Sequence, residues 1–384
     1  MQSWICCQLG AREHYAVPRA LKLDGLLDEL ITDLWIRPGT LLHMWQKRLT
    51  GRYHPDLTGA RVVAPNIPAL TFELKASLAR ENGWTLINRR NEWFQKHAVA
   101  QLARNHNGPR TVFAYSYAAK EIFEFARERG WRTVLGQIDP GPAEDLRLTS
   151  SKPVPKAYRD NWRHECSLAD QILVNSNWSR DALIAEGVAA EKIRVIPVAY
   201  EAANDTSTFQ RHYPRAFSAE RPLRVLFLGQ VSLRKGVAQL LEAVQLLSGE
   251  HVEFWFVGPV QIDVPQELKL HPQVRWFGAA PRVSVESYYR DADVFIFPTL
   301  SDGFGLTQLE AQAWKLPVIA SRYCGEVVRD GFNGVVLEEV SGRAIADVLL
   351  NFLRAPERLS AMSIRSGVDE RFSLGMLARR LRDI

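Results

Sequence analysis

Short hydrophobic runs alternate along this chain with longer stretches in which apolar residues recur at helical spacing. The runs in the first half predict strands at 4–9, 29–34, 111–117, 132–138, 171–176 and 192–199. The stretches between them predict helices at 91–105, 119–129, 155–168 and 178–186. These strands are rich in Val, Ile and Phe without polar alternation. Such strands are buried on both faces, so we expect parallel sheets covered by helices.

The same pattern begins again after a polar stretch that contains Pro214 and Pro222. It predicts strands at 224–229, 252–258, 274–278, 294–298 and 316–321, and helices at 237–247, at 284–291 and from Leu306. The restart predicts two doubly wound α/β domains, 1–205 and 223–371, joined by a linker at 206–222. Ligands of such sheets bind beyond the carboxyl ends of the strands. A site is therefore expected at the loops after 229, 258 and 298.

The loop after 298 carries two carboxylates, Asp302 and Glu310, separated by eight positions. Gly303, Phe304 and Gly305 make a turn between them, and a helix is expected from Leu306. Free amides at a helix start can bind phosphate, although Asp302 could equally be a simple helix cap. Eight helical residues span ~12 Å, whereas paired glycosidase carboxylates lie ~5–10 Å apart, which argues against a hydrolase pair.

Several stretches, in order, resemble the family-four retaining glycosyltransferases (glycosyl transferases group 1). They are VLFLGQVSLRKGVAQLLEAV (225–244), ADVFIFPT (292–299), DGFGLTQLEAQAWKLPVIAS (302–321) and GEVVRDGFNGVVL (325–337). Residues 169–200 are similar to the end of that family's acceptor domain. The resemblance implies the GT-B fold, in which two Rossmann-like domains face across a cleft. It also implies that the last stretch, 372–384, is a helix that crosses back to the first domain.

The resemblance assigns roles on the donor side of the cleft. It implies that Lys235 binds the diphosphate of a nucleotide sugar, together with Gly229 and the backbone of Gly303, Phe304, Gly305 and Leu306. It implies that Glu310 contacts the ribose. Two positions depart from the family pattern: Asp302 stands in place of a glutamate, and Gln230 in place of an arginine. Neighbouring Arg234 could supply the missing charge. Taken alone, Arg234 and Lys235 could also form a solvated loop.

Fewer residues can be assigned on the acceptor side. Gly10 follows the first predicted strand, and His14 on the same loop is a candidate acceptor contact or an ordinary surface histidine. The family often has a histidine at the end of the strand that matches 132–138. Gln137 occupies that place here and is followed by Asp139. Glutamine cannot shuttle a proton, so no acid or base is predicted at this position.

Charge and cysteine content add limits on partners and cofactors. The formal net charge is +5, with the basic excess in the first 200 residues. This excess fits either a soluble basic face or an anionic membrane surface. No Lys/Arg cluster with aromatic residues suggests nucleic acid. The Asp291-Ala292-Asp293 stretch precedes a buried strand, so a metal is not expected there. No cofactor is predicted.

Neither a signal peptide nor an apolar run long enough to span a membrane is recognised, so we expect a cytoplasmic protein, with a peripheral position at the inner membrane face as the alternative. Together these features predict a retaining hexosyltransferase of polysaccharide or glycolipid biosynthesis. It would use a UDP or GDP sugar and a glycan, glycolipid or small hydroxyl acceptor, with Asp302 and Lys235 in the catalytic roles. A non-catalytic nucleotide- or glycan-binding protein and a phosphorylase or sugar-phosphate synthase are the alternatives.

Overall fold

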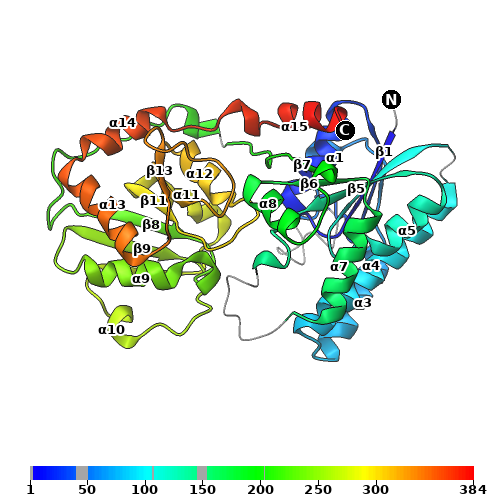
Figure 1. Ribbon diagram of the computed structural model, residues 1–384, viewed down its shortest axis with the longest axis horizontal. Helices are drawn as coiled ribbons and strands as arrows, with labels where there is room; N and C mark the ends of the chain where they lie inside the picture. Colours follow the sequence, from blue (N-terminus) through cyan, green and yellow to red (C-terminus); the bar gives the residue numbers. More distant parts are fainter. Residues whose placement is uncertain (1–2, 40–50, 106–107, 145–153, 203) are drawn as a thin grey trace.

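The computed structural model describes residues 3–39, 51–105, 108–144, 154–202 and 204–384, which form two lobes (Figure 1). Each lobe contains one parallel sheet. The first sheet has the order β3-β2-β1-β4-β5-β6-β7 and the second β10-β9-β8-β11-β12-β13. The expected GT-B architecture of two doubly wound domains is confirmed by this arrangement and by solved structures described below.

The strands of the first sheet are β1 (Ser3–Gln8), β2 (Leu27–Thr32), β3 (Val62–Val63), β4 (Arg110–Tyr115), β5 (Arg132–Gln137), β6 (Gln171–Val174) and β7 (Ile193–Val195). Those of the second are β8 (Leu223–Leu228), β9 (Val252–Val257), β10 (Val274–Gly278), β11 (Val294–Phe297), β12 (Val318–Ser321) and β13 (Gly334–Leu337). Every predicted strand is present within a few residues of its expected bounds. The strands β3 and β13 were not predicted.

Helices of the first lobe are α1 (Ala16–Leu23), α3 (Asn66–Leu78), α4 (Gly83–Asn105), α5 (Lys120–Glu128), α7 (Lys156–Leu168) and α8 (Asn177–Ala185). Helices of the second are α9 (Val237–Leu246), α10 (Gln266–Lys269), α11 (Arg282–Asp291), α12 (Thr307–Ala313), α13 (Gly342–Arg354) and α14 (Glu357–Arg365). Apolar clusters lie on both faces of each sheet, as expected of buried parallel strands. Within the described ranges, no helix has the length and apolarity needed to cross a bilayer.

The strand order reverses between β1 and β4 in the first sheet and between β8 and β11 in the second. At such a switch point the loops on the two sides diverge and leave a crevice at the carboxyl ends of the strands. The loops after β8 and β11, where the sequence places the donor residues, therefore flank the crevice of the second sheet. The loops after β1 and β4 flank that of the first.

The last helix, α15 (Leu374–Arg382), lies against α1 in the first lobe although the preceding α14 belongs to the second (Figure 1). Leu377 and Leu381 are buried in the apolar cluster that also contains Leu21 of α1. Arg382 forms an ion pair with Asp24 at 2.7 Å. The C-terminal segment thus contributes to the core of the domain that begins the chain.

We expect Leu381→Ala to destabilise the first domain by about 2–4 kcal/mol, because Leu381 is fully buried and its truncation leaves a cavity. The measurement is the midpoint of urea unfolding, followed by a probe in the first domain. Leu23→Ala is the matched control, because Leu23 lies on α1 and is 63% exposed. Equal midpoints for the two variants would mean that α15 does not support the domain.

Candidate functional site

The loops after β8, β11 and β5 converge where the two domains meet. Gly303, in the loop after β11, lies so close to the first domain that a Cβ atom there would collide with the carbonyl oxygen of Ile138. Ile138 directly follows β5. The predicted donor turn and the predicted acceptor-side strand end are therefore in backbone contact, and only glycine fits at the point of contact.

The loop after β8 is held in place by the loop after β11. The carbonyl of Arg234 accepts hydrogen bonds from the amide of Leu300 at 2.8 Å and from the hydroxyl of Thr299 at 3.1 Å. Gly236 has a left-handed φ of +71°, and a Cβ atom there would collide with the carbonyl of Pro298. These contacts fix the backbone on both sides of Lys235. The cationic side chains of Arg234 and Lys235 therefore project from a rigid turn.

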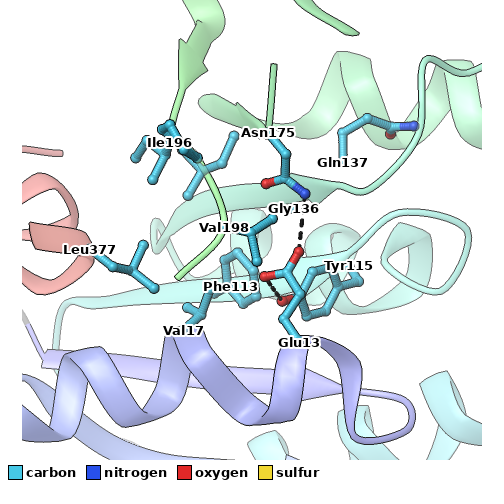
Figure 2. Close-up of a pocket in the computed structure, with 12 residues that line it drawn as sticks. Glu13, Val17, Phe113, Tyr115, Gly136, Gln137, Asn175, Ile196, Val198 and Leu377 are labelled. Atoms are coloured by element: carbon cyan, nitrogen blue, oxygen red, sulfur yellow. Dashed lines mark hydrogen bonds between the residues drawn. The ribbon is translucent and has the colours of Figure 1, made fainter. Parts of the chain in front are cut away.

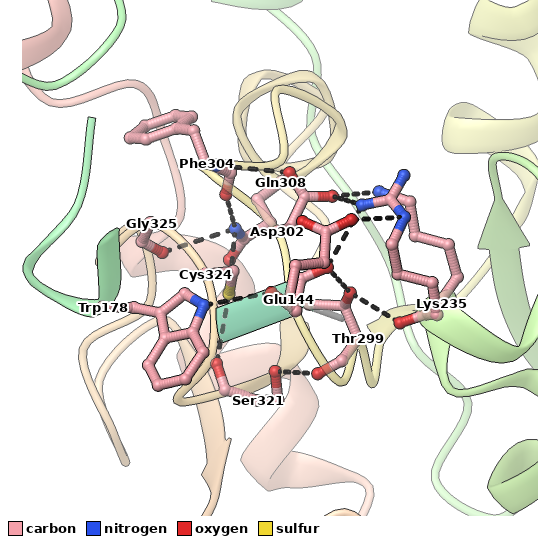
Figure 3. A network of polar contacts seen from close by, with 12 residues as sticks. Glu144, Trp178, Lys235, Thr299, Asp302, Phe304, Gln308, Ser321, Cys324 and Gly325 are labelled. Atoms are coloured by element: carbon pink, nitrogen blue, oxygen red, sulfur yellow. Dashed lines mark hydrogen bonds and ion pairs between the residues drawn. The ribbon is translucent and has the colours of Figure 1, made fainter. Parts of the chain in front are cut away.

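Charged side chains from the three loops form one network (Figure 3). Lys235 forms an ion pair with Asp302, and Arg234 Nη1 lies 3.6 Å from the same carboxylate. Arg234 Nε also lies 3.3 Å from Glu144 Oε1, a residue of the first domain. The ammonium of Lys235 sits 4.9 Å from the centre of the Phe297 ring. Both predicted donor-site cations are thus paired with carboxylates, one of them across the cleft.

Asp302 makes a different kind of contact with each of its two carboxylate oxygens. Its Oδ1 accepts a hydrogen bond from the amide of Phe304 at 3.2 Å, a contact within the turn. The N-cap position of α12 is Leu306, which has no side-chain cap hydrogen bond, so Asp302 does not cap the helix. Its Oδ2 contacts the two cations. One oxygen therefore shapes the turn, and the other takes part in the charge network.

Glu144 was not predicted as a site residue. It follows β5 by a few residues, and its carboxylate is one-fifth exposed. Burial, with smaller contributions from Asp139 and Asp302, raises the pKa of Glu144 to about 7 in spite of the lowering effect of Arg234 and Lys235. Glu144 Oε2 is buried and has no hydrogen-bond partner among the described residues. This carboxylate is thus stabilised mainly through the oxygen that faces Arg234.

The remaining residues of the predicted donor turn pack rather than project. The Phe304 ring is buried against Phe372 with 5.9 Å between ring centres, and the Phe304 amide is occupied by Asp302. Leu306 precedes the first turn of α12 and packs in the same apolar cluster.

Gly305, with φ +86°, lies against the Phe297 ring. Gly229 follows β8, and its carbonyl abuts Gly258. These residues set the shape of the loops.

Glu310 lies on α12 and faces a different space. Its Oε2 accepts a hydrogen bond of 2.7 Å from the hydroxyl of Tyr289, which is buried on α11. The pair lines a cavity of about 230 Å³ together with Tyr200 and Trp314. Tyr289 fixes the orientation of the carboxylate that the family resemblance places at the ribose.

On the first-domain side, Gln137 and Asp139 belong to one hydrogen-bond network. Gln137 is buried, donates to Asp139 Oδ1 at 2.7 Å and accepts from the indole of Trp162 at 3.0 Å. Asp139 also accepts from Tyr117 at 2.7 Å and from the amide of Gly141 at 2.9 Å. Burial raises the pKa of Asp139 in spite of these donors. Gln137 therefore orients Asp139 at the strand end next to Gly303.

The loop after β1 has an unusual backbone. Glu13, His14 and Tyr15 are successive non-glycine residues with left-handed φ values of 50°, 51° and 60°. Each costs roughly 1–2 kcal/mol, so tertiary contacts must hold them. Glu13 accepts hydrogen bonds from Asn175 at 3.0 Å and from Tyr115 at 3.3 Å in a small pocket (Figure 2). Burial raises the pKa of Glu13.

The predicted residues of this loop lie on either side of Glu13. The amide of Gly10 donates to Asp33 Oδ1 at 2.8 Å, which ties the start of the loop to the end of β2. The side chain of His14 is exposed. Sequence reasoning named Gly10 and His14 but missed Glu13, because nothing in the local pattern distinguishes a buried carboxylate from a solvated one.

Two groups of acidic residues bear on metal binding. Asp293 is buried and forms an ion pair with Arg221, with 2.6 Å between Nη2 and Oδ1, so it serves the packing of the second domain. Within the described ranges, His54, Asp56 and Glu201 are close enough to share an ion. Arg19 already pairs with Asp56 at 2.6 Å and with Glu201, so one guanidinium offsets part of this acidic charge.

Comparisons with known proteins agree with this geometry. Residues 222–355 match the family described as Glycosyl transferases group 1. A D-inositol 3-phosphate glycosyltransferase of Corynebacterium kroppenstedtii is 28% identical over 264 residues, which cover 62% of this chain and 57% of that protein. The amylovoran biosynthesis glycosyltransferase AmsK of Erwinia amylovora is 26% identical over 258 residues, covering 61% of this chain and 58% of that protein. The chain therefore spans somewhat more than half the length of these relatives.

Solved structures match the whole chain at low identity. Anabaena HepE in complex with UDP and glucose superposes with a TM-score of 0.63 at 14% identity and covers 100% of this chain and 99% of that one. The catalytic domain of starch synthase IV from Arabidopsis thaliana, bound to ADP and acarbose, superposes with a TM-score of 0.70 at 12% identity, covering 100% and 98%. At such low sequence identity, the structural similarity shows only that both domains share this fold.

Proposed function

We propose that this chain, whose residues 222–355 belong to the Glycosyl transferases group 1 family, transfers a hexose from a nucleotide diphosphate sugar to a hydroxyl acceptor. The observation that carries the proposal is the pair Arg234 and Lys235, held rigidly at the switch point of the second sheet and facing the first domain. A diphosphate leaving group gains negative charge as the glycosidic bond breaks. Fixed cations at that position stabilise it.

The proposed reaction needs no group beyond those of the chain and its substrates. Arg234 and Lys235 neutralise the departing diphosphate, and Asp302 holds both cations in place. The family resemblance favours transfer with retention, by attack of the acceptor on the same face from which the diphosphate leaves. In that reaction the departing phosphate accepts the acceptor's proton. Activity is expected to survive EDTA.

The acceptor site is proposed at the first-domain edge of the cleft, next to Gly303. Asp139 and Gln137 lie there, and Glu13 lines the pocket behind them. Carboxylates and amides of this kind bind the hydroxyl groups of a glycan, a glycolipid or a small polyol. Two relatives are named as a D-inositol 3-phosphate glycosyltransferase and an amylovoran biosynthesis glycosyltransferase, so small and polymeric acceptors are both reasonable substrates to test.

A peripheral contact with an anionic membrane is proposed for the face of α3. Ile67, Leu74 and Leu78 are 75%, 61% and 76% exposed, and Lys75 and Arg80 are exposed beside them. Apolar side chains flanked by cations are typical of helices that lie in a lipid interface.

The membrane contact predicts that the protein co-sediments with phosphatidylglycerol vesicles but not with phosphatidylcholine vesicles. The double substitution Leu74→Gln and Leu78→Gln should reduce the bound fraction at least roughly fivefold, because it removes the apolar area that enters the interface. Its thermal midpoint is the control for folding. Equal sedimentation of the variant and the wild type would show that α3 makes no such contact.

Nucleotide binding tests the proposed function without knowledge of the acceptor. A ligand that binds only the folded state raises its stability by RT ln(1 + [L]/Kd). We expect one nucleoside diphosphate among UDP, GDP and ADP to raise the thermal midpoint, and its monophosphate to raise it less. No shift with any diphosphate at millimolar concentration would contradict the proposal.

A further inference from the structure

The charge balance of the donor site suggests an additional residue that sets donor affinity. Arg234 and Lys235 are the two cations proposed to bind the diphosphate, and both already contact carboxylates. One of these carboxylates, Asp302, lies on the same domain as the cations. The other, Glu144, comes from the opposite domain in the turn after β5, and its Oε1 lies 3.3 Å from Arg234 Nε. The site thus holds about as much negative as positive charge before any substrate enters.

We propose that Glu144 competes with the donor diphosphate for Arg234, so that binding of the nucleotide neutralises or displaces this carboxylate. The inference rests on the proposed function and names a residue that the family resemblance does not assign. Glu144 approaches the guanidinium of Arg234 from the first domain, and a phosphate bound at the switch point would compete with it for this group.

Glu144 is held in the site by fewer contacts than Asp302. Asp302 has a hydrogen bond from the Phe304 amide in addition to its two cations. Among the residues that the structure describes, Glu144 is held by the contact with Arg234 alone, and its buried Oε2 has no hydrogen-bond partner. If Arg234 turned to a phosphate, the partly buried carboxylate of Glu144 would lose its cation, which is disfavoured.

The charged groups that face Glu144 determine how the affinity for the donor depends on pH. Burial, Asp139 and Asp302 raise the pKa of Glu144 to about 7, whereas Arg234 and Lys235 act in the opposite direction. A bound diphosphate adds negative charge and favours the protonated form further. Below this pKa Glu144 is neutral and does not oppose the donor. Above it the carboxylate is charged, so the affinity for the donor falls as pH rises through about 7.

The test compares wild type with Glu144→Gln, which keeps the size of the side chain and removes its charge. The probe is whichever of UDP, GDP and ADP binds wild type most tightly, titrated calorimetrically between pH 5.5 and pH 8.5. We expect equal Kd values at the lowest pH. At the highest pH we expect about tenfold tighter binding by the variant, the factor that corresponds to one pKa unit of coupling. Ionisation of the nucleotide itself affects both proteins equally and cancels in the ratio.

Glu326→Gln is the matched control, because Glu326 also bridges the domains, accepting a hydrogen bond of 2.9 Å from the amide of Asn177. Its Kd ratio to wild type should stay near one at every pH. If Glu144→Gln binds as tightly as wild type at pH 8.5, or more weakly, the inference is wrong while the proposed function stands. If neither protein binds any of the three nucleotides, the proposed function fails and this inference fails with it.

Discussion

Lys235→Met is expected to lower kcat/KM for the donor roughly 100- to 1,000-fold, the cost typical of losing one preorganised group that stabilises developing charge. Lys235 is 14% exposed and lies between Asp302 and the Phe297 ring, so water cannot easily replace its charge. The loss should appear in both kcat and KM, because the ammonium contacts the diphosphate in the bound donor and more strongly as the bond breaks.

Two further variants test whether the loss comes from the charge of Lys235. Lys235→Arg retains the charge in a different shape and should recover part of the activity. Lys192→Met removes a lysine of the first domain that donates to the carbonyl of Ser167 at 3.0 Å, and it should leave the donor kinetics unchanged. Activity of Lys235→Met within about threefold of wild type, in a folded protein, would remove the lysine from the mechanism.

Asp302→Asn is expected to lower kcat roughly 10- to 100-fold with a change of less than about threefold in donor KM. Asparagine still accepts the hydrogen bond from the Phe304 amide, so the turn before α12 should be preserved. It loses the charge that holds Lys235 and Arg234, so both cations lose their alignment with the leaving group. Asp302→Glu retains the charge and restores the residue type that the family pattern has, so it should recover most of the rate.

A second carboxylate substitution gives the contrasting result. Glu310→Gln should mainly raise donor KM, because a ribose contact is made equally in the ground state and the transition state. The two variants therefore separate the roles of the two carboxylates in one set of kinetic measurements. Wild-type kinetics in Asp302→Asn would leave that residue as a cap of the turn only.

The strands were the part of the fold most accessible from the sequence. Buried parallel strands such as β8 and β11 read as continuous apolar runs, so their positions follow directly from hydrophobicity. Helix α3 gave no such signal because Ile67, Leu74 and Leu78 face solvent instead of a core. Strand β3 is only two residues long. Helix α13 was missed although Ile345, Leu349 and Phe352 recur at helical spacing and are buried, so its pattern was present in the sequence.

Residues for the donor side of the site could be proposed from the sequence because they come from two short loops with recognisable order. Lys235 and Asp302 were identified from those loops. Their mutual ion pair, and the placement of Gly303 against Ile138, depend on how two domains meet. Glu144 and Glu13 could not be found for the same reason. Each becomes a site candidate only because a distant segment of the chain buries it or brings a partner to it.

The central claim is that this chain transfers a hexose from a nucleotide sugar. The direct measurement is release of free nucleoside diphosphate from a panel of UDP-, GDP- and ADP-hexoses, with glycan and polyol acceptors, in the presence of EDTA. The account predicts acceptor-stimulated release from at least one donor by wild type, and at least a roughly 100-fold slower release by Lys235→Met. Equal release by wild type and Lys235→Met, or release by neither under conditions where wild type binds the nucleotide, would contradict it.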